Sequence, residues 1–357
     1  MKLIDKYILK KFLGAFIFTV LIIVSIILVI DITEKTDKFA DAGLQTPQIL
    51  GYYLDFIPWI ANFITPLTVF IATVFVTAQM AGHTEIVAIL SSGVSFKRML
   101  LPYLIGSTMI AVTSFVLTGW VIPNSNKSRV AFEVEYLKSK FYFDKTNYHI
   151  QVAPNTYLYI RSYNNQTEMG YDFTLEKVDG TRLLEKLSAS RIKWDEDKSK
   201  WVLSNWRKHS ITGDVEKIEE GKEIDTTLAI HPSEFDNDYR SQDAMTIDEL
   251  NEQIDKLRLR GASNVEVFEV EKYTRFTSPF AVLILTFMGV IVSARKTRGG
   301  AGFQIALGFF LSFLYILFFI MTKTIAEAGS MNPAFSVWIP NILFGGISLL
   351  MYKYVPR

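Results

Sequence analysis

The residues that could carry chemistry are few in this chain of 357 residues. Its four histidines stand apart from one another: His83, His149, His209 and His231. A helical zinc site needs two histidines three or four positions apart, so we expect no metal site. The absence of cysteine excludes disulfides and thiolate ligands. The single Gly-Lys pair, at 221 and 222, lacks the flanking residues of a phosphate-binding loop, so we expect no nucleotide or other cofactor on this chain.

Catalysis inside a membrane is also disfavoured. A hydrolase there needs a nucleophile with a neighbouring base, or a pair of carboxylates. The long apolar runs contain serines but no His, Asp, Glu or Lys that could activate them. We interpret four of these serines as residues that bond to the helix backbone or pack between helices: Ser25, Ser107, Ser114 and Ser312. No catalytic residue is therefore assigned.

One acidic residue has a distinctive setting, in the stretch HTEIVAILSSGVSFKRML between two apolar runs. On a helical wheel its apolar residues fall on one side: Ile86, Val87, Ile89, Leu90 and Val94. The other side carries small and polar residues with Glu85. Such a helix lies along a surface, and its carboxylate is suited to pair with an arginine of another protein. The pattern is equally typical of an interfacial helix whose Glu85 is only hydrated or caps the helix.

Basic residues follow the far ends of two apolar runs. Lys35 and Lys38 come after the first run, and Lys127 and Arg129 come after the third. Together they could surround an anionic ligand at the boundary between membrane and water. The alternative is ordinary solvated loop charges, or side chains that extend toward the water.

These residues must be positioned by membrane helices. Half of the chain is hydrophobic, and six apolar runs free of charged residues occur at 12–30, 57–80, 99–123, 276–294, 299–322 and 331–352. Each has about the 20 residues that cross a bilayer as a helix. A charge at mid-bilayer costs roughly 2.5–3.5 kcal/mol, which explains why charges are excluded from all of them. The sequence therefore predicts six transmembrane helices.

Orientation follows from the basic residues of the short loops. They cluster before the first run, between the second and third, between the fourth and fifth, and after the sixth: Lys2, Lys6, Lys10, Lys11, Lys97, Arg98, Arg295, Lys296, Arg298, Lys353 and Arg357. All four clusters fall on one side, which the positive-inside rule makes cytoplasmic. Both termini and the helix at about 83–97 are then cytoplasmic, and residues 124–275 lie outside. A net charge of +1 without a basic run gives no reason to expect nucleic acid.

The long insert between the third and fourth runs predicts a β domain. Five segments alternate apolar and polar residues between turn-like clusters: 141–152, 156–163, 171–178, 182–194 and 200–211. Five or more such strands indicate a sandwich, a jelly roll or a partly open barrel. Thr246 and Glu249 then form a capping box, which begins a helical connection. We therefore divide the chain into residues 1–123, 124–245, 246–275 and 276–357.

A proline in the last run has a predicted local effect. Pro340 frees a backbone carbonyl within the apolar helix, and Asn341 beside it could satisfy that group. We expect a kink at this point.

The arrangement of three spans, an external β domain and three more spans resembles the permease subunits LptF and LptG of the lipopolysaccharide export ABC transporter. The segments that carry the resemblance are LIDKYILKKF, TPLTVFIATVFVTAQMAGHTEIVAILSSGVSFKRML, GWVIPN, LSASRIKWDEDKSKWVLSNW and MNPAFSVWIPNIL. DITEKTDKF after the first span is closer to LptG. The fold class implied is an α-helical membrane protein with six transmembrane helices (3+3) and an inserted, all-β, jelly-roll-like periplasmic domain, located in the inner membrane.

The resemblance also implies partners and site residues. The helix between the second and third spans would dock into a cytoplasmic ABC ATPase dimer (LptB-like), which binds the ATP, and Glu85 would face an arginine there. The ATPase-coupling residues would be Glu85, Ile86, Ile89, Leu90 and Gly93. A second permease (LptF-like), the periplasmic bridge components (LptC/LptA-like) and lipopolysaccharide complete the set of partners.

The basic residues at the outer end of span one are associated in LptG with the phosphates of the lipid. This association favours Lys35 and Lys38 as substrate-binding residues. Lys127 and Arg129 only approximate the family's basic positions after span three.

Three functions remain open from the sequence. The chain could be a permease that exports lipopolysaccharide, driven by a separate ATPase. It could be an ATPase-coupled permease that transmits force without moving lipid. It could also be a membrane-anchored binding or assembly protein.

Overall fold

The computed structural model describes two compact units within the chain. It covers residues 2–137, 148–164, 167–196, 198–212, 215–228, 230, 240–259, 265–294 and 300–353. The helical unit comprises Met1–Phe132, Gln242–Asn251 and Glu266–Arg357, and the β unit comprises Glu133–Ser241 and Glu252–Val265. Most of the insert between the third and fourth apolar runs thus belongs to a separate compact unit.

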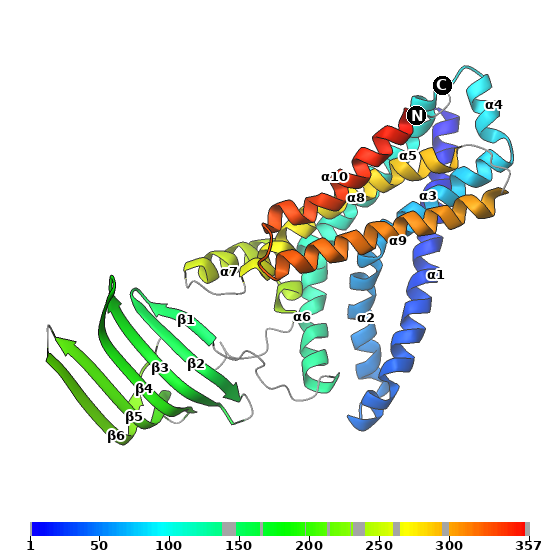
Figure 1. Ribbon diagram of the computed structural model, residues 1–357. Helices are drawn as coiled ribbons and strands as arrows, with labels where there is room; N and C mark the ends of the chain where they lie inside the picture. Colours follow the sequence, from blue (N-terminus) through cyan, green and yellow to red (C-terminus); the bar gives the residue numbers. More distant parts are fainter. Residues whose placement is uncertain are drawn as a thin grey trace. The chain divides into compact units, whose positions relative to one another are not determined.

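The helical unit contains the helices that are long and apolar enough to cross a membrane (Figure 1). In chain order its helices are α1 (Leu3–Asp41), α2 (Thr46–Phe63), α3 (Thr65–Gly82), α4 (Glu85–Ser91), α5 (Phe96–Val116), the π-helical turn η1 (Leu117–Val121), α6 (Ile122–Phe132), α8 (Val265–Ser293), α9 (Gly300–Glu327) and α10 (Pro333–Tyr352). Among the described residues six candidate spans result, in α1, α3, α5 with α6, α8, α9 and α10. The predicted six-helix membrane fold is confirmed.

Two helix boundaries differ from the sequence-based expectation. The second apolar run, predicted as one helix over 57–80, is divided between α2 and α3. Pro66 stands at the start of α3, and a proline ring and its missing N–H interrupt a continuing helix. The third run was expected to end at Pro123, but the helix continues through α6 to Phe132. Here η1 ends at Val121, two residues before the proline, and changes the hydrogen-bond register.

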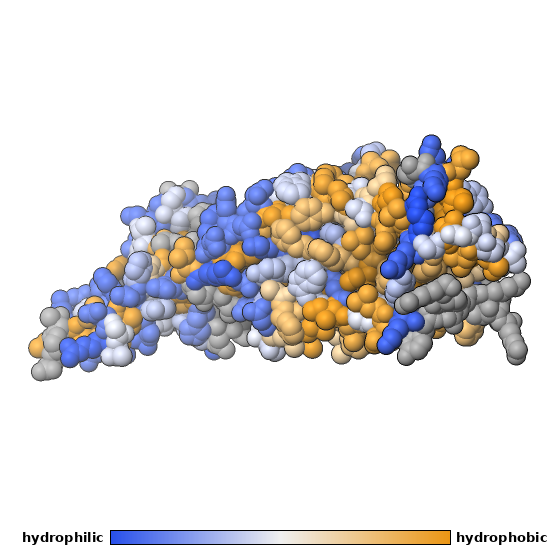
Figure 2. Space-filling view, turned by 90° about the horizontal axis from the view of Figure 1, so that it is seen from above, coloured by the Kyte–Doolittle hydropathy of each residue, from blue (hydrophilic) through white to orange (hydrophobic). Residues whose placement is uncertain are grey.

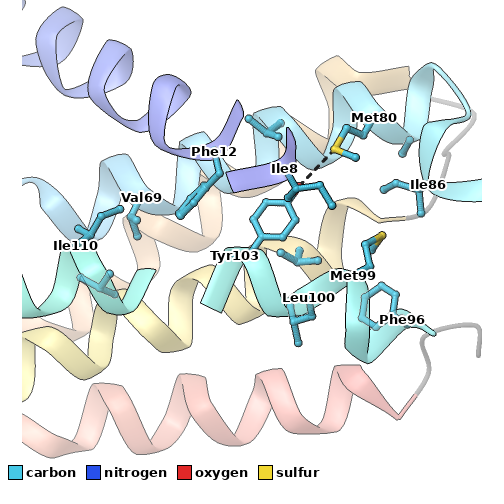
Figure 3. Close-up of a cluster of buried hydrophobic side chains, with 14 of the residues drawn as sticks. Ile8, Phe12, Val69, Met80, Ile86, Phe96, Met99, Leu100, Tyr103 and Ile110 are labelled. Carbon is cyan, nitrogen blue, oxygen red and sulfur yellow. Dashed lines mark hydrogen bonds between the residues drawn. The ribbon is translucent and has the colours of Figure 1, made fainter. Parts of the chain in front are cut away.

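A buried apolar cluster holds α1, α3 and α5 together at one end of the helical unit (Figure 3). Tyr103 is at its centre, where its hydroxyl accepts a hydrogen bond from Thr77 Oγ1 at 3.0 Å and lies 3.7 Å from the sulfur of Met80. The Phe12 ring of α1 packs against Tyr103, with centroids 5.5 Å apart. Gly106 lets this ring approach, because a Cβ at that position would lie 2.7 Å from Phe12 Cδ1.

The outer surface of the helical unit is strongly apolar. Figure 2 shows hydrophobic residues over much of its visible face. The middle of α1 exposes a row of large apolar side chains: Ile17, Phe18, Leu21, Ile22, Ile26, Val29 and Ile30. Hydrocarbon or another apolar helix is the natural environment for such a surface.

A polar residue joins the last three helices. Asn341 of α10 donates from Nδ2 to the carbonyl oxygen of Thr277 on α8 at 3.0 Å, and its Oδ1 accepts from the Tyr315 hydroxyl on α9 at 2.9 Å. We expected Asn341 to satisfy the carbonyl freed by Pro340, and this was wrong. The side chain is buried where three helices meet, and its amide bonds across to the other two helices.

The β unit is a separate antiparallel sheet inserted between the two sets of helices. Its strands are β1 (Tyr148–Ala153), β2 (Thr156–Asn164), β3 (Met169–Asp179), β4 (Arg182–Asp195), β5 (Lys200–Thr212) and β6 (Val215–Thr226). The predicted fold class, with an inserted all-β domain, is confirmed. The described strands form one sheet in sequential order, β1 to β6, which is the order of a meander. Of the predicted segment 141–152, residues 141–147 lie outside the described residues.

The alternation of buried and exposed residues shifts by one position in several strands, at residues that lie opposite one another in the sheet. In β2 the buried residues are Leu158 and Ile160, followed by Tyr163 instead of a residue at 162. Asp172 of β3 and Asn205 of β5 lie at this level with left-handed φ angles of 52° and 51°. The shift bends the strands, yet it keeps the apolar side chains on one face. That face holds the core of the unit: Ile150, Leu158, Ile160, Tyr163, Phe173, Leu187, Ala189, Ile192, Trp201, Leu203 and Ile230.

The start of α1, α4 and the end of α10 lie at the same end of the helical unit (Figure 1). Arg98 of α5 forms an ion pair of 2.6 Å with Asp5 of α1, and Phe96 packs against Tyr352 of α10 at 6.2 Å between ring centroids. We call this the inner end, and the opposite end the outer end. The basic residues at 295, 296 and 298 lie outside the described residues.

Candidate functional site

The short helix α4 occupies the inner end of the helical unit. It covers Glu85–Ser91, whereas the sequence suggested a helix at about 83–97. Thr84 before it has a φ of 62°, and Gly93 after it has a φ of 84°. Left-handed residues end helices, and glycine adopts this conformation at low cost. α4 is therefore a separate element between α3 and α5.

Of the five residues that the helical wheel places on the apolar side, Ile86, Ile89 and Leu90 face the bundle of this chain, whereas Val87 is exposed. Ile86 is only 3% exposed and belongs to the same buried cluster as Met80 and Met99 (Figure 3). Ile89 and Leu90 are partly buried against this cluster. Three of the predicted coupling residues thus attach α4 to the helices behind it, and their role toward an ATPase stays a prediction.

The opposite side of α4 is exposed and consists mainly of small residues. We define the α4 outer face as Val87, Ala88, Ser91 and Ser92. Val87 is 60% exposed. Gly93 is exposed beside this face, and no atom lies within 4 Å of where its Cβ would be. A face without long side chains allows another protein to approach the helix closely.

Glu85 is held by α1. Its Oε1 lies 3.2 Å from Lys11 Nζ, and its Oε2 accepts a hydrogen bond from the Tyr7 hydroxyl at 3.0 Å. His83 Nδ1 is 4.0 Å from Oε1. The sequence reasoning assigned Glu85 to an arginine of a partner and missed these two α1 residues. Their spacing of four on one helix, with Lys11 next to an apolar run, was the available signal.

The predicted basic residues at the outer end of α1 have different surroundings. Lys35 forms an ion pair of 2.8 Å with Asp31, and its Nζ donates to the Tyr52 hydroxyl at 2.6 Å. Asp31 in turn accepts from the Tyr53 hydroxyl at 2.9 Å. Lys38 is exposed and has no ion pair with the residues that the structure describes. Lys35 is thus fixed in place, whereas Lys38 is open to a ligand.

The other two predicted basic residues do not complete a ring of exposed charge. Arg129 is 1% exposed, with its guanidinium 4.3 Å from the centre of the Trp59 ring and its Nε 2.9 Å from Asn126 Oδ1. It therefore cannot contact a surface ligand in this conformation. Its burial follows from the continuation of α6 beyond Pro123, which packs this helix against α2. Lys127 remains half exposed and pairs with Glu249 at 2.9 Å.

Helix α2 supplies aromatic residues that the sequence reasoning missed. Tyr52 and Phe56 contact Lys35, and Trp59 contacts Arg129, so the two basic residues meet the same helix at different points. Burial raises the pKa of the Asp55 carboxyl, and the positive charge of Arg129 partly offsets this effect. The spacing of three and four residues between these aromatics is the signal that could have predicted a common face.

Comparison with known proteins agrees with this architecture. The family profile described as "Lipopolysaccharide export system permease LptF/LptG" matches residues 6–354. The chain belongs to this family. It is also similar to the "Lipopolysaccharide export system permease protein LptG" of Haemophilus influenzae, with 22% identity over 348 residues that cover 96% of this chain and 95% of that relative. The resemblance noted in the sequence is confirmed.

Membership in the LptF/LptG family fixes the general class of the protein. The chain is a multi-pass membrane permease of a lipopolysaccharide export system, and this class implies the inner membrane. Such a permease is not itself catalytic, in agreement with the lack of catalytic pairs in the apolar runs.

Proposed function

We propose that this chain is an LptG-type permease subunit that extracts lipopolysaccharide from the inner membrane and passes it to a periplasmic bridge toward the outer membrane. A separate cytoplasmic ATPase dimer drives it, and a second, LptF-like permease completes the cavity. The observation that carries the proposal is the family match, which runs through both sets of spans and the inserted β unit. The periplasmic bridge consists of LptC/LptA-like components.

Force enters at the inner end. The α4 outer face docks on the ATPase, and Gly93 allows close contact there. Behind this face, Ile86 is buried among residues of α3 and α5, and Glu85 is bonded to α1. Because packed cores transmit strain instead of absorbing it, displacement of α4 moves these three helices together. This arrangement supports coupling of the nucleotide cycle to the bundle through α4.

The cargo requires both apolar surface and positive charge. Each methylene withdrawn from a bilayer costs about 0.8 kcal/mol, so a lipid with several acyl chains needs an energy source and a substitute apolar surface. The exposed apolar side chains of α1 supply part of such a surface. At the outer end of the same helix, Lys38 is open to an anionic group, and Lys35 is held close by. These two lysines bind the phosphates of the lipid.

The test is site-specific photocrosslinking in membranes that contain the ATPase and the second permease. A photoreactive residue at position 38 forms adducts with lipopolysaccharide, and these decrease when ATP is added. The same residue at position 218, an exposed position of β6, serves as a control for random labelling. ATP hydrolysis without lipid adducts at 38, 35 or the exposed side of α1 would contradict lipid export and favour force transmission alone.

A further inference from the structure

The chain returns from the β unit to the helical unit through a segment whose backbone carbonyls accept hydrogen bonds from a buried arginine. This return segment contains the 3-10 turn η4 (Ser241–Ala244) and the start of α7 (Ile247–Leu259). Arg275 of α8 is 2% exposed. Its Nη1 donates to the carbonyl oxygen of Met245 at 2.6 Å, and its Nη2 donates to that of Gln242 at 3.0 Å.

The same guanidinium connects the return segment to α9. Arg275 Nε donates to Glu271 Oε1 at 2.9 Å, and Glu271 Oε2 lies 3.5 Å from Lys323 Nζ on α9. We call Gln242, Met245, Glu271, Arg275 and Lys323 the clasp. A guanidinium directs several donors in a fixed plane, so it can bond to two carbonyls and a carboxylate at once, which an ammonium group on a flexible stem does not reproduce.

Helix α6 and η1 hold the return segment from a second side. Asn126 Nδ2 donates to the carbonyl oxygen of Asp243 at 2.8 Å. Gly119 of η1 leaves room for Ile247, whose Cδ1 would lie 3.1 Å from a Cβ at position 119. The outgoing helix and the return segment are therefore attached to each other, and the clasp attaches them to α8 and α9.

This arrangement goes beyond what is needed to end a loop. The capping box of Thr246 and Glu249 already satisfies the start of α7, with hydrogen bonds of 2.7 and 3.3 Å. The buried hydrogen bonds of Arg275 contribute nothing to that cap. They instead prevent the return segment from rotating relative to α8. Buried polar groups lose their hydrogen bonds only at high cost, so the attachment is stiff.

We infer that Arg275 is a positioning residue: through the clasp it makes the return segment, which continues along the chain into the β unit, move as one body with α8 and α9, so that a stroke of the helices also moves the return segment. The inference rests on the proposed export function and assigns Arg275 a role in lipid transfer, separate from ATP hydrolysis and lipid binding.

The first experiment compares Arg275→Met with Arg275→Lys in proteoliposomes that contain the ATPase and the second permease. Lys256→Met is the matched control, because Lys256 lies on α7 with an exposed ion pair outside the clasp. We expect roughly tenfold slower lipid transfer to a soluble acceptor for both Arg275 variants. ATP hydrolysis and lipid occupancy should stay within about twofold of the parent chain, and the control should resemble the parent in all three.

A covalent rescue separates positioning from general damage. The native chain has no cysteine, so Gln242→Cys with Arg275→Cys can be joined selectively by a short bismaleimide. The double-cysteine variant should transfer lipid slowly before it is crosslinked and at the parent rate afterwards. The bismaleimide should not change the transfer rate of the Arg275→Cys single variant. Normal transfer by Arg275→Met would overturn the inference. So would loss of hydrolysis, lipid occupancy and transfer together, or linked protein that stays inactive.

A distance measurement distinguishes failure of the clasp from failure of the export function. Spin labels at position 242 and at the exposed position 276 of α8 report the attachment directly, without lipid. In the parent background we expect one narrow distance that ATP binding to the partner leaves unchanged, and in Arg275→Met a broad distribution. A parent distance that shifts with nucleotide would refute the clasp. A parent protein that moves no lipid but keeps the narrow distance would refute only the export function.

Discussion

Helix α4 at the inner end of the helical unit and the return segment at its outer end are attached by different kinds of contact. At the inner end α4 is attached by apolar burial of Ile86, with one ion pair at its edge, and its other side is open. At the outer end the return segment is attached by buried hydrogen bonds of Arg275 and Asn126.

The two kinds of attachment respond differently when the attached segment is displaced. Apolar contacts are not directional, so the packed cluster around Ile86 can be displaced together with α4 and remain packed. Buried hydrogen bonds from a guanidinium have fixed directions and break when the geometry changes. The inner end is therefore suited to receive a movement, and the outer end to pass it on without distortion.

The largest expected effect tests the apolar seat of α4. Ile86→Ala leaves a cavity in the inner cluster and should lower the free energy of unfolding by about 2–5 kcal/mol. Val87→Ala, on the α4 outer face, should change stability by less than about 0.5 kcal/mol but weaken binding of the ATPase. Thermal unfolding in nanodiscs and a pull-down with the ATPase measure the two properties. Equal losses of stability in both variants would contradict the assignment of the two sides of α4.

The next prediction concerns whether Glu85 acts through its contact with α1 or through a contact with the ATPase. If its contact with α1 matters, Lys11→Met should reduce coupled ATP hydrolysis about as much as Glu85→Gln, and the double variant should be no worse than either single one. Lys10→Met, one residue away on α1, is the control. A normal Lys11→Met beside an inactive Glu85→Gln would instead assign Glu85 to the ATPase.

At the outer end a smaller effect is expected for the ring that covers Arg129. Trp59→Leu removes the contact between ring and guanidinium, which contributes about 0.5–2 kcal/mol, and Trp59→Phe should retain part of it. The measurement is thermal unfolding of both variants. Equal stability of the parent and Trp59→Leu would show that the contact contributes nothing.

The smallest expected effect is a dependence on pH. The hydrogen bond from Lys127, followed by the backbone bond from Thr246, lowers the pKa of the Glu249 carboxyl below its ordinary value of 4.5. A lowered carboxyl pKa stabilises the fold above the ordinary value, and this contribution disappears as the pH falls through the lowered one. As the pH is lowered from 6 into the acid range, the free energy of unfolding should therefore decrease less steeply in Glu249→Gln than in the parent chain. Parallel curves for the variant and the parent would rule out this contribution.

Parts of this architecture could be read from local sequence, and other parts could not. Charge-free runs of sufficient length predicted the membrane helices, and alternation predicted five strands. β6 was missed because all but the last of its residues are exposed, and their apolar pattern is weak. It is held by its backbone ladder with β5, which no local pattern reports. The division at Ile64 was readable in principle from Pro66, whereas the helical course of residues 124–132 depended on packing against α2.

The candidate sites show the same limit. The sequence identified Glu85 and Lys35 as charged residues and assigned both to outside partners. Spacing shows that Tyr7 and Lys11 share one face of a helix, but it does not show that this face meets Glu85, nor that Tyr52 meets Lys35. Arg129 was taken for an exposed charge, and Arg275 was not singled out. Whether an arginine is buried depends on what surrounds it in space.

The sequence by itself determined the class of the protein: membrane helices on either side of a β insert. Hydropathy and periodicity suffice for this because each is a property of consecutive residues. Only the tertiary structure decided which charges face a ligand and which hold the molecule together. Arg275 meets the carbonyl oxygens of Gln242 and Met245 across more than two dozen intervening residues, and such meetings exist only once the helices have packed.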